Sequence, residues 1–561
     1  WFASAIHPHA RTETVVGHTT LATGAYPAAH GMVSNRWYQK EDNDEYVKRD
    51  SISDPDYRVF GEDGKTGVSP RAILASTFSD ELYHRTGGAA KIFSVSGKDR
   101  AAIPLAGHTG KAFFYATLTN QGSTTGNFTT SSYYYDDDAF PPSDENPTLT
   151  FMEEWNQQEV DCGDGDRRRR VLCMLGKKWH LSRPIESYLF KEVTNSFPAG
   201  TPPAGQMAFL ETSPYSLFLD SFIDDQGNLR GHTYGSSPTT PTYFNNLTIS
   251  PELDRLTIEF AKMLVATQHL GEDDVPDYLA IGLSATDLIA HWWGPNSLES
   301  EDNMLQLDAT LASFFSWLDT RVGQENTLIV LSGDHGGPEF PEVLAATKLG
   351  PGLAQTYTGR VASNTIPRAV QGALEQLAGE PIACIVGEDG EGYSAFESGC
   401  LIYSFPYLYM SDELVAQAGT HRSAVEMAAA NAVSTVEGVL VGVRARDANG
   451  GRGIYEELAA MVRRNDHPWR SGQVYVVQAP QWQVNNSPSP GEGSGDMILL
   501  EHGSPWAYDT HVPIVFAGAG VPHRFVTRRV HTTDVAATLA AMLDTNEPSA
   551  LVGTPLVEVW P

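Results

Sequence analysis

The sequence predicts an α/β fold with an at least partly parallel sheet, because strand-like and helix-like patterns alternate along it. Residues 277–286, 327–332 and 512–516 are rich in aliphatic side chains, and each stretch ends in a polar or glycine-rich corner. A helical pattern over about 298–322 lies between the first two stretches, and its apolar stripe consists of Met304, Leu307, Leu311, Phe314 and Leu318. Strand, helix and strand at this spacing predict a βαβ unit. A second amphipathic helix, over about 250–268, precedes that unit.

Chain length predicts one large α/β domain with insertions, or a core with a cap, since 561 residues exceed a typical single domain. We assign three core segments and two insertions that cap the edge of the sheet carrying the site. The core segments are 1–119, 207–344 and 486–561, and the insertions are 120–206 and 345–485. A flexible connection over 484–497 leads back to the core.

Composition limits the partners that the protein can bind. Hydrophobic residues make up 41% and charged residues 19%, which is typical of a globular chain with a sizeable core. The net charge is −31, so nucleic acid and anionic membranes are poor partners, because both need a basic face. The sequence contains no uninterrupted apolar run of 18 residues, which argues against a transmembrane segment. It does not indicate the oligomeric state.

The four cysteines form two local pairs, Cys162/Cys173 and Cys384/Cys400. We expect two disulfides in an exported protein, periplasmic or secreted; four free buried thiols are the alternative. The chain opens without a signal peptide, and we expect an upstream segment to have been removed. The arginine run 167–170, between the first two cysteines, is expected to be a solvated loop.

Aspartate and histidine side chains occur at three strand boundaries. Asp287 and His291 follow the first predicted strand, and Asp334-His335 follows the second. His502 lies just before the third. Each element alone is ambiguous, but imidazole and carboxylate together suit zinc, and ligands collect beyond the carboxyl ends of parallel strands. The five side chains suffice for most of two Zn²⁺ sites.

The segment around Thr14 supplies a candidate nucleophile, with Thr12 as the local competitor. A threonine hydroxyl is a poor nucleophile at neutral pH. A bound zinc ion lowers the pKa of a coordinated O–H group by many units and so activates it.

Together these motifs resemble the alkaline phosphatase superfamily. The resemblance rests on Thr14-x-x-Gly-His, on the downstream Thr-Gly-x-x-Pro-x-x-His-Gly, and on the Asp/His motifs in the family's order. It implies a three-layer sandwich with a largely parallel central sheet and cap insertions. It also implies hydrolysis of phosphate esters through a phosphothreonine intermediate on Thr14. One zinc ion is expected on Asp287, His291 and His502, and the other on Asp334, His335 and Thr14.

Lys98 and Arg100 separate the subfamilies within this resemblance. The segment Ser94-Val-Ser-Gly-Lys98-Asp-Arg100 resembles the PafA-type phosphomonoesterases, in which a lysine and an arginine two residues apart hold the phosphate. In an extended segment, residues i and i+2 face the same way. Asn35 matches the family's asparagine that hydrogen-bonds a phosphate oxygen. The sulfatase signature is absent at Thr14.

Family members also carry an aspartate on a strand about forty residues before the nucleophile, whereas Thr14 is preceded here by thirteen residues. We therefore expect that the N-terminus is incomplete; the alternative is that the zinc ion on Thr14 lacks one ligand. The remaining histidines near the motifs are expected to be structural or supporting residues in turns, namely His7, His9, His18, His30, His108 and His511.

The first hypothesis is zinc-dependent hydrolysis of small phosphate monoesters. A phosphodiesterase or nucleotide pyrophosphatase on the same scaffold is the second. A non-catalytic exported protein that binds phosphate or glycans is the third. An anionic ester requires local positive charge to overcome the acidic surface, and Lys98, Arg100 and the two Zn²⁺ ions would supply it.

Overall fold

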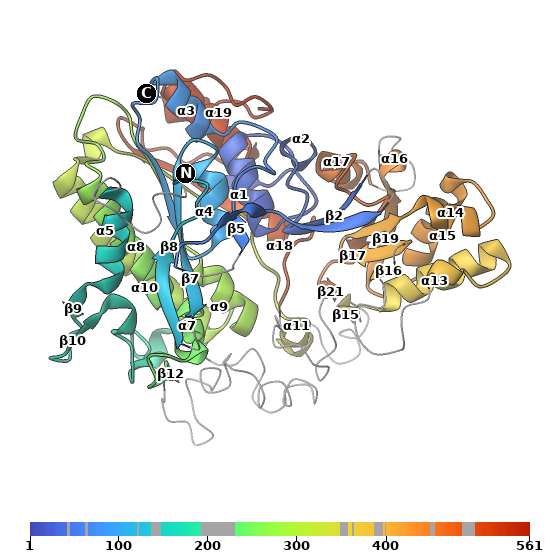
Figure 1. Ribbon diagram of the computed structural model, residues 1–561, viewed down its shortest axis with the longest axis horizontal. Helices are drawn as coiled ribbons and strands as arrows, with labels where there is room; N and C mark the ends of the chain where they lie inside the picture. Colours follow the sequence, from blue (N-terminus) through green and yellow to red (C-terminus); the bar gives the residue numbers. More distant parts are fainter. Residues whose placement is uncertain are drawn as a thin grey trace.

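In the described residues, the computed structural model contains three sheets of four or more strands, two of them mixed and one antiparallel, together with small two-stranded sheets and the covering helices (Figure 1). It describes residues 1–41, 45–61, 66–120, 123–135, 147–191, 231–347, 357–361, 364–385, 397–398, 400–448, 455–484 and 500–560. The expected connection over 484–497 lies almost wholly outside these residues.

The first sheet joins the two ends of the chain. Its order is β14 (Leu328–Ser332), β22 (His511–Gly518), β1 (Phe2–Ile6) and β23 (Val530–His531). β22 runs antiparallel to both β14 and β1, so β14 and β1 point the same way, and β23 is parallel to β1. α19 (Asp534–Met542) and α1 (Thr14–Thr23) pack together beside this sheet.

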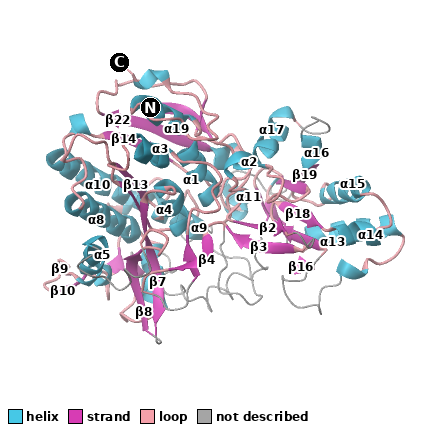
Figure 2. Cartoon of the chain, turned by 45° about the horizontal axis from the view of Figure 1, so that its top comes forward, coloured by secondary structure: helices cyan, strands magenta, loops and turns pink. Residues whose placement is uncertain are grey.

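The second sheet contains the longer parallel array. Its order is β13 (Tyr278–Gly282), β6 (Ile92–Ser96), β7 (Lys111–Asn120) and β8 (Ser123–Thr129), and only β8 is antiparallel to its neighbour. Helices lie on both sides (Figure 2): α8 (Pro251–Thr267) and α10 (Leu298–Arg321) on one, and α1 and α4 (Asp99–Ala106) on the other. The predicted α/β class is confirmed.

The predicted strands and helices are present, but the predicted βαβ unit is wrong in its pairing. β13 and β14 belong to different sheets, and β14 pairs only with the antiparallel β22 among the described residues. The apolar stripe of α10 is also less buried than expected, since Phe314 is buried but Met304 is 51% exposed. The periodicity of a segment predicts which of its own side chains face the core, whereas the pairing of a strand depends on segments that are distant in the sequence.

The third sheet lies on the right of Figure 1, across α1 from α8 and α10. Its order is β16 (Glu397–Ser398), β17 (Leu401–Ser404), β18 (Tyr407–Met410), β20 (Val474–Gln478) and β19 (Val439–Arg444). α13 (Thr365–Ala378) and α15 (Arg422–Val433) share an apolar core with it. A hairpin of β2 (Arg36–Lys40) and β3 (Tyr46–Asp50) reaches this sheet, where Tyr38 and Tyr46 contact Tyr409.

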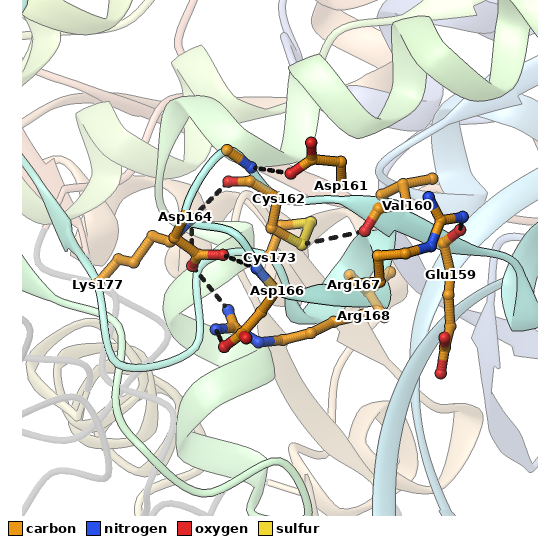
Figure 3. The surroundings of a disulfide bond; sticks show 12 residues. Glu159, Val160, Asp161, Cys162, Asp164, Asp166, Arg167, Arg168, Cys173 and Lys177 are labelled. Carbon is orange, nitrogen blue, oxygen red and sulfur yellow. Dashed lines mark hydrogen bonds and ion pairs between the residues drawn. A yellow bond between two sulfur atoms is a disulfide. The ribbon is translucent and has the colours of Figure 1, made fainter.

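Both predicted cysteine pairs are disulfides, Cys162–Cys173 and Cys384–Cys400. The arginine run between the first pair is solvent-accessible as expected, but it is not a loop, because Arg167–Arg169 forms strand β10, antiparallel to β9 (Glu159–Asp161). Figure 3 shows the ion pairs that fix the arginine run: Arg168 pairs with Asp164 and Asp166. In the described residues, no helix combines the length and apolarity that crossing a membrane requires.

Candidate active site

Thr14 is the first residue of α1 and is buried, with 6% of its surface exposed. The helix begins where the chain turns back after β1, and Glu13 occupies the N-cap position. The next turn of α1 lies against the end of β14, because a Cβ atom on Gly17 would be only 1.8 Å from the backbone oxygen of Asp334. Glycine is required here for close approach of two backbones, which brings Thr14 to the Asp334 segment.

The predicted metal ligands converge on one locus at the carboxyl ends of the strands. Asp287 and His291 lie one turn apart on α9 (Ala285–Trp293), and His291 Nε2 is 3.4 Å from Asp287 Oδ2. His502 Nε2 lies 3.4 Å from the other oxygen of Asp287, and His335 Nε2 lies 4.0 Å from it. His335 Nε2 is also 3.2 Å from Asp334 Oδ2.

Each of the three histidines predicted as metal ligands has its Nδ1 atom hydrogen-bonded to a backbone carbonyl group. The Nδ1 atoms of His335 and His502 donate to Gly336 O at 2.8 Å and Thr12 O at 2.7 Å, and His291 Nδ1 donates to Leu500 O. A hydrogen bond at Nδ1 fixes the tautomer that leaves Nε2 as a metal ligand. Carbonyl groups therefore aim all three Nε2 atoms at the carboxylates.

This donor set fits a transition-metal cation. One ligand atom from each of Asp287, His335 and His502 lies within 4.8 Å of the others. His335 Nε2 is buried and makes no hydrogen bond within the described residues, so a cation would satisfy it. Two carboxylates and three imidazoles match the preference of zinc. Two of the tightly grouped residues were predicted for one ion and His335 for the other.

The carboxylates and imidazoles of this cluster shift one another's pKa values. Burial disfavours the ionised carboxylate of Asp334, but His335 and His18 outweigh burial and lower its pKa. Burial similarly opposes the charged form of His291, whereas Asp287 raises its pKa on balance. Burial and the neighbouring His335 lower the pKa of His502 well below its usual value, which favours the neutral imidazole that binds metals.

Two hydrogen bonds hold Asn35 beside Thr14, the predicted nucleophile. Its side-chain oxygen accepts from Val15 N at 3.2 Å, so its amide NH₂ group is left to donate. Its backbone N–H donates to Glu13 Oε2 at 2.7 Å, and Ser34 Oγ donates to the same oxygen at 2.6 Å. The other oxygen of Glu13 accepts from Arg11.

Lys98 and Arg100 reach the same edge from the end of β6. Lys98 Nζ contacts Asp287 Oδ2, and Arg100 Nη2 lies 2.7 Å from Asp50 Oδ2. The expectation that both lie on an extended segment is wrong, because only Lys98 is extended, at the N-cap of α4, and Arg100 lies in the first turn of that helix. Their proximity to the cluster comes from the turn between strand and helix.

Three residues support the predicted site residues in a way that the sequence did not indicate. His18 was expected in a turn, but it lies within α1, where its Nδ1 contacts Thr14 O at 2.8 Å and Asp334 Oδ2 at 3.2 Å. Glu13 supports Asn35. Asp254 on α8 accepts from Ala285 N at 3.0 Å at the start of α9, ahead of Asp287. Only the position of His18 in Thr14-x-x-Gly-His was a usable signal.

The fold and the clustered side chains define a hydrolase of the alkaline phosphatase type. Comparison with known proteins identifies the family within this class. The family model for type I phosphodiesterase / nucleotide pyrophosphatase matches residues 1–505, and the chain belongs to that family, within the alkaline phosphatase superfamily.

Three relatives illustrate the match. The chain is 26% identical to alkaline phosphatase PhoV of Synechococcus elongatus, over 98% of this chain and 85% of the relative. It is 27% identical to a calcium-transporting ATPase of Myroides odoratus, over 98% of this chain and 86% of that protein. The same values hold for alkaline phosphatase PafA of Elizabethkingia meningoseptica. A crystal structure of PafA matches with a TM-score of 0.76 at 24% identity, covering 100% of this chain and 92% of that one.

Proposed function

We propose that the protein hydrolyses phosphate monoesters with two Zn²⁺ ions, through a phosphothreonine intermediate on Thr14. The observation that carries the proposal is the convergence of five metal-ligand side chains beside the N-terminus of α1, with Lys98 in contact with Asp287. Thr12 is a weaker candidate nucleophile, because its hydroxyl already donates to Ser504 O at 2.9 Å and is fully buried.

Asp287, His291 and His502 would hold one zinc ion, and Asp334, His335 and Thr14 the other. When bound, the zinc ions supply positive charge that lowers the pKa of a coordinated O–H group and stabilises a departing oxygen. His18 keeps the Thr14 turn against Asp334, so the hydroxyl and the ligand stay in register.

Thr14 Oγ attacks phosphorus in line, a P–O bond to Thr14 forms, and the bond to the leaving alcohol breaks. Water then attacks the phosphothreonine, releasing inorganic phosphate and restoring the hydroxyl. Asn35 donates from its amide to one phosphoryl oxygen, while Lys98 and Arg100 hold others. To do so, Lys98 must exchange Asp287, and Arg100 must exchange Asp50, for the phosphate.

Two charged side chains beside the phosphoryl group favour a monoester over a diester. A monoester has more non-bridging oxygens and more negative charge for Lys98 and Arg100 to bind, and removing one such donor typically costs a hundredfold or more in rate. The two cations also offset locally a net charge of −31 that repels anionic substrates.

The test compares a nitrophenyl phosphate monoester with the bis-nitrophenyl diester. We expect a preference for the monoester, loss of activity in Thr14→Ala, and little change in the matched control Thr12→Ser, which keeps the hydroxyl. A preference for the diester, or full activity of Thr14→Ala, would overturn the assignment.

A phosphodiesterase or nucleotide pyrophosphatase remains the second candidate, because the matching family model carries that description. The double variant Lys98→Ala/Arg100→Ala separates the two. Monoesterase activity should fall by about 10³-fold or more. The control Arg85→Ala/Lys91→Ala removes the same charge from residues that pair with Asp544 and Asp273. Equal activity of both double variants would favour the diesterase.

Metal analysis tests the non-catalytic alternative: about two zinc ions per chain support the enzyme, and none supports a binding protein. The two disulfides support a periplasmic or secreted location. The division into a core with insertions at 120–206 and 345–485 stays a prediction, with the insertions expected to shape the leaving-group side.

A further inference from the structure

Asp509 is a buried carboxylate that touches two of the ligand-bearing turns and lies outside the ligand set. It lies in the short helix α18 (Ala507–Thr510), which leads into β22, and its side chain has no exposed surface. Its side chain accepts three hydrogen bonds at one oxygen. Gly503 N, Ser504 N and Ser504 Oγ donate to Asp509 Oδ2 at 3.0, 2.7 and 2.6 Å.

The backbone of the same residue holds the other turn. Gly336 N donates to Asp509 O at 2.7 Å, and a Cβ atom on Gly336 would lie 2.1 Å from Tyr508 O. Gly336 follows His335 directly, and Gly503 follows His502 directly. Asp509 therefore contacts the residue that follows each histidine: its carboxylate binds Gly503, after His502, and its backbone carbonyl binds Gly336, after His335.

The two histidine rings have a defined mutual orientation. The rings of His335 and His502 are stacked, with centroids 3.5 Å apart and planes 18° apart. Neither turn has regular secondary structure to fix it: residues 500–504 form no helix or strand, and residues 335–340 form none either. Burying a carboxylate is costly, and Asp509 Oδ1 makes no hydrogen bond within the described residues.

We propose that Asp509 is a positioning residue that holds His502 and His335 in register for metal binding. This inference rests on the proposed zinc site. Supporting residues of this kind typically change metal affinity by about 10- to 100-fold when they are removed. Because Asp509 does not contact substrate, its removal should act on zinc affinity first and on turnover at saturating zinc much less.

The experiment measures zinc affinity by competition with a chromophoric chelator, on the wild type and on two variants. Asp509→Ala should bind zinc about 10- to 100-fold more weakly, with kcat largely recovered at saturating zinc. Asp509→Asn keeps an acceptor oxygen for Gly503 and Ser504, so its affinity should stay within about threefold of the wild type. Wild-type affinity in Asp509→Ala, or equal loss in both variants, would overturn the proposal.

A matched control distinguishes positioning from general stability. Asp302 is also fully buried and accepts from Trp179, Ser182 and Tyr188, away from the metal ligands. Asp302→Ala should lower the Tm of the metal-free protein and leave zinc affinity unchanged. A parallel loss of affinity in that control would reduce the role of Asp509 to folding. If the wild type binds zinc but hydrolyses no monoester, the proposed function fails, while the affinity comparison still decides the role of Asp509.

Discussion

His18 links the proposed nucleophile to the proposed metal site, since its Nδ1 atom lies 3.2 Å from the carboxylate of Asp334 and 2.8 Å from the carbonyl of Thr14. Burial opposes a charged imidazole, but Asp334 raises the pKa of His18 on balance. Through these two contacts His18 ties α1 to the end of β14.

Replacing His18 with leucine should remove the side-chain contact between α1 and the Asp334 carboxylate. We expect kcat for a phosphate monoester to fall by about 10- to 100-fold, as for other partners of metal ligands. Steady-state kinetics at saturating zinc is the measurement. The control is His511→Ala, which removes an exposed imidazole whose Nε2 atom hydrogen-bonds the carbonyl oxygen of Ala3. Equal kcat in the two variants would contradict a role for the His18 contact.

Glu13 should control both stability and phosphate binding, because it joins Arg11 to the Asn35 turn. Glu13→Gln leaves the buried guanidinium of Arg11 without its charge partner, a change that typically costs about 3–5 kcal/mol. Inorganic phosphate should also inhibit more weakly. A double-mutant cycle with Arg11→Met isolates the pair: the double variant should recover part of the stability lost by Glu13→Gln. Additive losses would refute the coupling.

Gly17→Ala should disrupt the site through its backbone. The new Cβ atom would overlap the carbonyl oxygen of Asp334, so α1 or the end of β14 must shift. We expect a lower unfolding midpoint and loss of activity. Gly372, on the exposed surface of α13, has open space around it, and Gly372→Ala should stabilise the protein by about 0.5–1 kcal/mol. Similar behaviour of the two alanine variants in thermal unfolding would exclude the proposed close contact.

Acid should unfold the protein partly through buried neutral histidines. Burial lowers the pKa of His30 to about 3 and that of His7 to about 4. The unfolded state binds these protons near pH 6.5, so the free energy of unfolding should fall as the pH drops from about 6.5 towards the folded values. Each histidine contributes a slope of about 1.4 kcal/mol per pH unit. His30→Asn should remove about one proton from that slope between pH 6 and 4 in denaturant titrations. Parallel curves for variant and wild type would exclude this contribution.

The elements were predictable from the sequence because they depend on local patterns. The aliphatic side chains of residues 327–332 favour a strand whatever its neighbours are. The helices at 250–268 and 298–322 show helical spacing of apolar residues in the sequence itself. Pairing was not predictable in the same way. The partner of β14 is β22, almost two hundred residues later, and no feature of either strand specifies the other.

The ligand cluster was predictable as a set because each Asp/His motif follows or precedes a strand. The conformation at Arg100 was not. Lys98 provides no capping hydrogen bond, and Pro104 lies inside α4, so the segment lacks the usual signals of a helix. The supporting contacts of Glu13, Asp254 and Asp509 depend on buried hydrogen bonds between distant segments, which single residues in a sequence do not reveal.

The contact between His502 and Thr12 spans 490 residues, and β1 is enclosed by β22 and β23 from the far end of the chain. Such long-range closure slows folding, because loop entropy is lost before the contacts form. During synthesis, the N-terminal segment with Thr14 must therefore wait for nearly the whole polypeptide before β22, β23 and His502 are available to it. A chain released before residue 500 lacks both β22 and β23, which flank β1, and also the predicted ligand His502, so we expect it to be inactive.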